Sequence, residues 1–258
     1  MSRPAGIPAT PQIRSSQHGE PSLTVETTSG LTVFGRTTTR ADGEFAIDAD
    51  PGPLAARRRA VVDLPWMWLD QAHGREVVTV AGPASVEVRG RAADALVTAA
   101  PKVVLAVQSA DCAPLLLWSP EGVIGAAHAG WRGLTAGIIE RTADAMRAIG
   151  ATTIDADLGP CIHAECYAFG AADLAPIVRQ LGAGVEGRTA DGGPALDLVE
   201  GVRLAATAAG IDLWVSTVDV GRSCTSCNDG KWFSHRARTE RERMATIIWR
   251  EDGPGATT

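Results

Sequence analysis

This 258-residue sequence has neither a long apolar run nor a large excess of charge of one sign. No stretch approaches the roughly 20 apolar residues that a membrane helix needs, and residues 1–22 hold no apolar segment of signal-peptide length. The net charge is −6, and lysine and arginine are scattered apart from a run at 57–59. We therefore expect a cytoplasmic protein that binds neither nucleic acid nor membrane.

The glycine patterns that bind nucleotide phosphates are missing as well. No GxGxxG follows a predicted strand, and there is no GxxxxGKS or GxxxxGKT, so neither fingerprint supports a dinucleotide or ATP enzyme. Cysteine is scarce and odd in number, with five residues in a chain that shows no export signal. Metal binding, catalysis or simple burial is therefore favoured over a disulfide framework.

The apolar pattern predicts a mixed α+β fold. Short runs rich in β-branched residues predict strands that begin near residues 31, 76, 94, 102, 114, 122, 153 and 211. Helical spacing marks three stretches that each end in glycine: 134–150, 171–182 and 197–210. Since many predicted strands follow one another through short turns, mixed or largely antiparallel sheets are expected rather than a regular βαβ succession.

The domain organisation follows from the same pattern. We expect one catalytic domain over residues 23–250, a disordered segment over 1–22 and a frayed end over 251–258, because both ends are polar and lack periodicity. The glycine-punctuated stretch 41–59 predicts a loop followed by a short helix.

The chain has only five histidines, and two of them share a setting with one cysteine. His73 precedes Gly74 near a strand end, Cys112 lies between two apolar runs, and His128 closes an apolar run. Two imidazoles and a thiolate supply three zinc ligands and leave a fourth position for water, as in catalytic sites. Two alternatives stay open: Cys112 is a small buried hydrophobe, or it is a nucleophile with His128 as its base.

Four segments carry a resemblance to a known family: DQAHGREV, VQSADCAPLLLWSPEGVIGAAHAGWRGLTAGIIERT, LGPCIHAECYAFG and CTSCNDGKWFSHRARTERERMATIIW. They closely resemble, in order, marker segments of the multifunctional purine nucleoside phosphorylase family, once named polyphenol oxidase or laccase-domain proteins. The resemblance implies zinc bound by His73, Cys112 and His128. It also implies a layered α/β/β/α sandwich with mixed sheets, shared with certain cysteine hydrolases. The implied activities are phosphorolysis of adenosine, inosine, guanosine and methylthioadenosine, with deamination of adenosine.

Several further residues are predicted to serve the nucleoside and phosphate. Arg132 stands at the mouth of a helix expected to begin near Leu134, a natural anion site, with a salt bridge as the alternative. Substrate binding is also predicted for Gln71, Arg40 and Arg57, although a charge run such as 57–59 is more often a solvated face. The resemblance is weaker before residue 65, where Ala56 replaces an expected asparagine.

Two more features have competing interpretations. Asp111 could act on a substrate proton or orient a ligand, but an acidic residue beside a strand end is as often a turn or cap group. Cys224 and Cys227 form a CxxC that looks like half a zinc ribbon or a redox pair. Because there is no second CxxC, burial is favoured for both, and one zinc ion per chain is expected.

Three rival functions remain open at this point. A copper-dependent polyphenol oxidase is suggested by the older family name, but Cys112 and His128 are too far apart for a compact blue-copper segment. A multicopper cluster needs more histidines than five. Bacterial relatives with similar motifs imply a cysteine- or zinc-dependent amidase that edits peptidoglycan precursors. A non-catalytic zinc protein is the third possibility.

Overall fold

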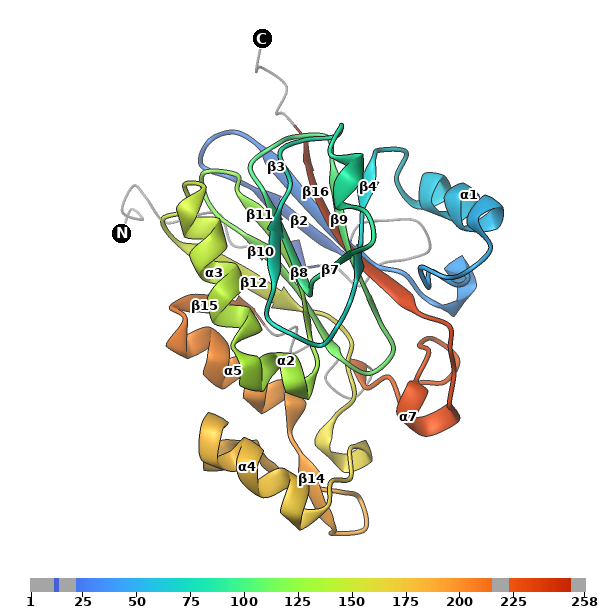
Figure 1. Ribbon diagram of the computed structural model, residues 1–258, viewed down its shortest axis with the longest axis vertical. Coiled ribbons are helices and arrows are strands. Elements are labelled where there is room, and N and C mark those ends of the chain that lie inside the picture. Colours follow the sequence, from blue (N-terminus) through green and yellow to red (C-terminus); the bar gives the residue numbers. More distant parts are fainter. Residues whose placement is uncertain (1–11, 14–21, 215–222, 252–258) are drawn as a thin grey trace, which may run out of the picture.

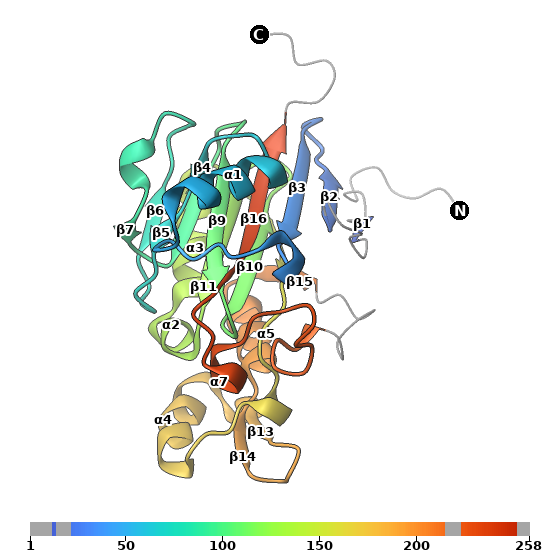
Figure 2. The same cartoon turned by 90° about the vertical axis from the view of Figure 1, so that its right-hand side faces the viewer.

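The computed structural model describes residues 12–13, 22–214 and 223–251, which form two six-stranded sheets stacked face to face (Figure 1 and Figure 2). In spatial order, the first sheet contains β1 (Gln12–Ile13), β2 (Leu23–Glu26), β3 (Thr32–Thr37), β16 (Met244–Glu251), β9 (Val104–Ser109) and β4 (Trp66–Met67). The second contains β15 (Ile211–Trp214), β12 (Ile154–Leu158), β10 (Ala113–Trp118), β11 (Ile124–Ala129), β8 (Ala95–Thr98) and β6 (Val77–Thr79).

Both sheets are mixed. The inner strands pair antiparallel, whereas β4 pairs parallel with β9, β6 parallel with β8, and β15 parallel with β12. Two small ribbons complete the strands, the parallel pair β5 (Leu69–Asp70) with β7 (Arg91–Ala92) and the antiparallel pair β13 (Glu186–Arg188) with β14 (Pro194–Leu196). The predicted mixed α+β class is confirmed.

Helices cover the outer faces of the stacked sheets (Figure 1). α2 (Trp131–Ala136), α3 (Ile138–Ala148) and α5 (Leu198–Ala208) lie against the second sheet, and α1 (Pro51–Val61) lies on the far side of the first. The other helical segments among the described residues are η1 (Arg40–Asp42), η2 (Val86–Val88), η3 (Ala164–Cys166), α4 (Ala171–Leu181), η4 (Ala183–Val185) and α7 (His235–Arg238). None of the described helices is long and apolar enough to cross a membrane.

The strand β10 shows why its sequence is apolar at every position. Leu115 and Leu117 pack toward the helices, while Leu116 and Trp118 pack toward the first sheet. Successive side chains of a strand point to opposite faces, and both faces of this strand are covered. All six residues of β10 are therefore buried.

The predicted elements agree with the structure except at one helix and one strand. The helix predicted over 134–150 is two helices, α2 and α3, because Gly137 between them adopts a left-handed backbone with φ of 86°. The C-terminal part of the strand predicted from residue 211 lies outside the described residues. The predicted segments 1–22 and 251–258 lie largely outside them too, although residues 12–13 form β1 against β2.

The contact between the sheets yields a stability test at Gly35 on β3. A Cβ atom there would lie 2.6 Å from Leu116 Cδ1 and 3.1 Å from Leu23 Cβ. We expect Gly35→Ala to lower the free energy of unfolding by about 1–3 kcal/mol, measured by urea titration, because overpacking forces the sheets apart. Gly230→Ala is the control, since a Cβ atom added at that position would meet no atom within 4 Å. Equal urea midpoints for the two variants would contradict the tight sheet contact.

Candidate functional site

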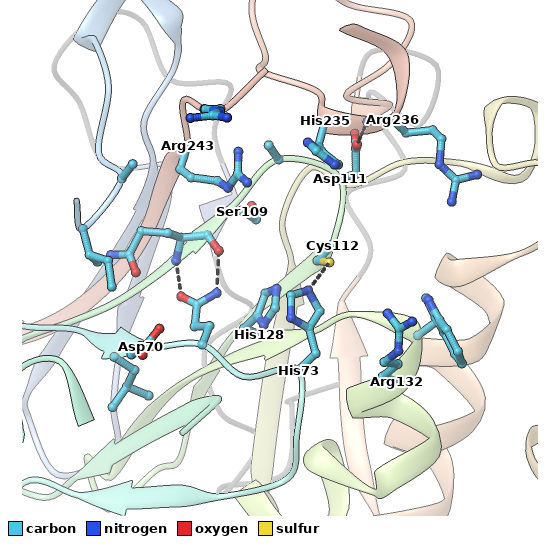
Figure 3. A pocket seen from close by; sticks show the side chains of 18 of the residues that line it. Asp70, His73, Ser109, Asp111, Cys112, His128, Arg132, His235, Arg236 and Arg243 are labelled. Atoms are coloured by element: carbon cyan, nitrogen blue, oxygen red, sulfur yellow. Dashed lines mark hydrogen bonds between the residues drawn. The ribbon is translucent and has the colours of Figure 1, made fainter. Parts of the chain in front are cut away.

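The three predicted metal ligands meet at one end of the second sheet (Figure 3). Cys112 directly precedes β10, His128 lies on β11 opposite Pro114, and His73 lies in the loop between β5 and β6. One ligand atom from each of the three lies within 4.8 Å of the others, and Cys112 Sγ is 3.7 Å from His73 Nε2. The antiparallel pairing of β10 with β11 brings the start of one strand beside the end of the next, so residues distant in sequence become neighbours.

Asp94, a residue that the sequence analysis did not single out, holds both histidines. Its side chain accepts hydrogen bonds from His128 Nδ1 at 3.0 Å, from the backbone N–H of His73 at 2.9 Å and from that of Gly74 at 2.6 Å. The backbone N–H of His128 also donates to the carbonyl of Asp94. Burial by itself raises the pKa of this carboxyl, but the bonds from His128, Gly74 and His73 lower it below its usual value. Asp94 is therefore an ionised acceptor that fixes the orientation of His128.

The loop around His73 is constrained on two sides. His73 has a positive φ of 57°, and the hydrogen bond from its backbone N–H to Asp94 helps to hold this conformation. Gly130 lies on the other side, where an added Cβ would come within 2.9 Å of both Cys112 Sγ and His73 Cδ2. The backbone at Gly130 thus approaches the two ligands as closely as a glycine permits.

Charge coupling prepares Cys112 to act as a ligand. Burial opposes ionisation of its thiol, but the charge of His128 and hydrogen bonds with both histidines lower the pKa to about 6. Burial likewise lowers the pKa of His128, whereas the Cys112 thiolate and Asp94 raise it to about 9. Thiolate is the form that binds metal or attacks an electrophile, and it dominates at neutral pH here.

Asp111 has a structural part in the turn before Cys112. Its φ is 107°, its oxygens accept from Thr225 Oγ1 and from the backbone N–H of Arg236, each at 2.6 Å, and it is buried. These bonds tie the turn to the start of α7 and to the segment around Thr225. The cap-like interpretation of Asp111 describes these contacts, and a role on a substrate proton stays a prediction.

A pocket of about 730 Å³ opens over the three ligands and is lined by side chains from several elements. In Figure 3, Cys112, His73 and His128 lie at its centre, with Arg132 on one side and Arg243 on the opposite side. Arg236 and Arg241 also line it. This size fits a nucleoside-sized ligand, and the arginines make part of the wall cationic.

The four residues predicted to bind substrate have different positions. Arg132 lines the pocket, with its guanidinium 4.3 Å from the centre of the Trp131 ring. Gln71 also lines it, although its amide is paired with the backbone N–H and C=O of Gln108. Arg40 is paired with Glu240, and Arg57 Nε donates to the carbonyl of Glu44. Neither Arg40 nor Arg57 is among the residues that line this pocket, so their substrate roles stay predictions from the sequence.

Two unpaired polar atoms in the pocket wall were missed by sequence reasoning. Gln108 Oε1 and Ser109 Oγ are buried and have no hydrogen-bond partner among the described residues. Buried polar atoms are nearly always paired, so two unpaired ones are an unusual feature of the pocket wall. Their position at the end of β9, immediately before the Asp111 turn, is the only signal that could have identified them.

Comparisons with known proteins identify the chain's family. The model of a family described as multi-copper polyphenol oxidoreductase laccase matches residues 39–251. The chain belongs to this family. Similar proteins include several named purine nucleoside phosphorylase. One from Streptomyces griseus is 36% identical over 79% of this chain and 84% of its own length. One from Deinococcus radiodurans is 40% identical over 72% and 73%.

Two solved structures of similar proteins agree with the architecture. YlmD from Geobacillus stearothermophilus superposes with a TM-score of 0.75 at 27% identity, covering 92% of this chain and 98% of its own. The Bacillus licheniformis protein YfiH gives 0.72 at 25% identity, covering 90% and 97%. The described fold is therefore largely shared with these proteins.

The CxxC segment departs from its sequence interpretation. Cys224 is buried, as expected, but Cys227 is exposed and its sulfur lies 3.3 Å from that of Cys166. No sequence motif connects Cys166 with Cys227, because the segments that contain them are far apart along the chain. Backbone hydrogen bonding of the β-bridge type between residues Cys161 and Cys224 brings the two segments together.

The role of Asp94 can be tested with Asp94→Asn. An amide oxygen cannot accept from His128, His73 and Gly74 together, so we expect the zinc affinity of the His73–Cys112–His128 site to fall by about 10–100-fold. The measurement is the zinc concentration that half-protects Cys112 from iodoacetamide, with the alkylated peptide identified by mass spectrometry. Asp70→Asn, an exposed residue of the same pocket, should leave that concentration unchanged. Equal protection of the Asp94 variant and the native protein would remove Asp94 from this role.

Proposed function

We propose that the protein is a zinc-dependent purine nucleoside phosphorylase that acts on adenosine, inosine, guanosine and methylthioadenosine and also deaminates adenosine. The observation that carries the proposal is the pocket itself, in which a His2Cys ligand set lies between arginine side chains. Relatives named purine nucleoside phosphorylase support the same activity. Cytoplasmic location and kinship with cysteine hydrolases stay predictions from the sequence.

The donor set fits a catalytic zinc ion. His128 Nδ1 is engaged by Asp94, which leaves Nε2 for a metal, and Cys112 supplies a thiolate. A histidine that donates its second N–H to a carboxylate is the usual arrangement around zinc. A zinc ion bound by His73, Cys112 and His128 would supply Lewis-acid chemistry and lower the pKa of a nearby water. Copper is the alternative metal, but the chain's five histidines cannot build a multicopper cluster in addition.

The nucleoside is proposed to lie against the wall formed by the end of β9. Gln108 Oε1 can accept a hydrogen bond and Ser109 Oγ can donate or accept one. Rotation of these side chains toward the pocket would let them bind an exocyclic amine, a ring nitrogen or a ribose hydroxyl. Tyr167 also lines the pocket, with its ring beneath the Arg236 guanidinium at 4.6 Å. The Arg236 guanidinium thus covers one face of this ring, and the ring adds an aromatic element to the wall of the proposed nucleoside site.

Phosphate is proposed to bind on the arginine side of the pocket. In phosphorolysis, a phosphate oxygen attacks the anomeric carbon of the ribose and the bond from that carbon to the purine nitrogen breaks. The base leaves with the bonding electron pair and takes up a proton. Arg132 is exposed beside the metal ligands, so its guanidinium can hold two phosphate oxygens and orient another toward the sugar.

A cysteine-dependent amidase that edits peptidoglycan precursors is the second candidate. It is favoured by one observation, the thiolate of Cys112 beside His73 and His128, which also suits nucleophilic attack on an amide. The two functions differ in their requirement for phosphate. An amidase has no use for a phosphate site at Arg132, whereas a phosphorylase fails without one.

The phosphate requirement gives the sharpest test of the proposed reaction. We expect Arg132→Ala to reduce phosphorolysis by about tenfold to a hundredfold, mainly through the KM for phosphate, because a charge-assisted contact is lost. Arg132→Lys should recover part of the activity, since an ammonium cannot grip two oxygens in one plane. The measurement is ribose 1-phosphate formed from inosine as a function of phosphate concentration, with ammonia release from adenosine followed in parallel.

Arg141→Ala on α3 is the matched control, because Arg141 is exposed and does not line the pocket. It should keep the native phosphate dependence. An unchanged KM for phosphate in a folded Arg132→Ala enzyme would exclude Arg132 and direct the search to Arg243 and Arg236. No ribose 1-phosphate from any of the proteins would contradict the phosphorylase proposal.

A further inference from the structure

A second group of metal-binding side chains lies outside the pocket. Glu165, Cys166, Cys224 and Cys227 each offer one ligand atom, and these four atoms all lie within 4.8 Å of one another. They come from two segments that meet in space, η3 and the CxxC turn at 224–227. The group shares no residue with the His73–Cys112–His128 set.

We propose that Glu165, Cys166, Cys224 and Cys227 form a structural zinc site. Three thiolates and a carboxylate make a closed four-ligand set, the arrangement typical of structural rather than catalytic zinc. Ligand atoms around tetrahedral zinc are roughly 3.8 Å apart for sulfur. The 3.3 Å between the sulfurs of Cys166 and Cys227 is close to that spacing and far from the roughly 2.0 Å of a disulfide.

The CxxC segment that supplies Cys224 and Cys227 is a closed turn. The N–H of Asn228 donates to the carbonyl of Cys224 and closes the turn. The backbone N–H groups of His163, Cys227 and Ser226 are directed at the sulfur of Cys224. Amide donors directed at a cysteine sulfur satisfy the negative charge that metal binding requires.

The two segments are held together before any metal binds. The backbones at Cys161 and Cys224 pair in an isolated parallel β-bridge, and the N–H of Thr225 donates to the carbonyl of Cys161. The His163 ring lies 3.7 Å from a Glu165 oxygen and is positioned to orient that carboxylate. Three thiols and a carboxylate converge here, which is more than a disulfide between two of the cysteines needs.

A metal ion here would stiffen the wall of the pocket. Tyr167 directly follows Cys166 and lines the pocket, and Thr225 directly follows Cys224 and bonds to Asp111. The second site does not depend on the reaction at the first, since a chain without phosphorylase activity can still hold this ion. An ion at this second site would affect the enzyme through the positions of Tyr167 and Thr225.

Zinc content and variants test the proposal directly. Protein purified with reductant and without chelator should contain about two zinc ions per chain, one at each site. Cys227→Ser and Cys112→Ala should each retain about one, and the double variant about none. Cys227 is exposed, so its replacement leaves the packed interior intact. Cys161→Ala is the control, because this buried thiol lies outside both ligand groups and its loss should leave both ions.

Thermal unfolding separates the two sites without an activity assay. A strong chelator should lower the melting temperature of Cys112→Ala, because it removes the ion held by Glu165, Cys166, Cys224 and Cys227. It should leave the melting temperature of the double variant, which holds no ion, unchanged. Either of two results would overturn the proposal. One is a zinc content that is the same in Cys227→Ser as in the native protein, and the other is a protein purified without reductant that is two hydrogens lighter, with the Cys166 and Cys227 peptides linked.

Discussion

The site depends on one buried carboxylate. Asp94 is fully buried directly before β8, and its two oxygens accept three hydrogen bonds, two from the loop at His73–Gly74 and one from the ring of His128. A buried charge is tolerated only when it is well paired, so this carboxylate costs stability unless all three donors are in place. The same bonds therefore enforce the loop conformation and the orientation of the ring. Cys112, across the site, is then the third member of a coupled set of charges.

The fold supplies what this arrangement needs. β8, β10 and β11 are neighbours in one sheet, and Asp94, Cys112 and His128 all lie at the same end of it. The opposite sheet contributes the end of β9, which carries Gln108 and Ser109 to the same pocket. Because both sheets are packed on both faces, their ends are rigid platforms for side chains that must hold a fixed geometry.

Much of the fold could be predicted, because its central strands are apolar on both faces whereas its helices are apolar on one face only. The two kinds of element therefore have different apolar patterns in the sequence. The fully buried runs of β9, β10 and β11 are continuous in sequence, and α4 and α5 keep the helical spacing that predicts them. The break at Gly137 was missed because a single glycine inside a helical pattern has no fixed meaning. β16, which joins the centre of the first sheet, was not predicted as a strand, although its segment was noted as a family marker.

The site was only partly predictable, for reasons of distance along the chain. The ligands His73, Cys112 and His128 were found from their residue types and family motifs, but Asp94 looks like any polar residue before a strand. The prediction that Cys227 is buried was wrong, since its side chain is exposed. Its contact with Cys166 could not be predicted, because the two residues are about 60 positions apart and no local spacing connects them. Arg236, Arg241 and Arg243 similarly appear as a charged surface stretch until the fold brings them to the pocket.

The most direct test of the account is phosphorolysis of inosine by protein from which the metal has been stripped and then restored. The Cys227→Ser variant is the right material, because it is expected to keep only the site at His73, Cys112 and His128. We predict that ribose 1-phosphate formation disappears on stripping and returns in proportion to the zinc rebound, up to about one equivalent per chain. A stripped, folded enzyme that phosphorolyses inosine at the native rate would contradict the account.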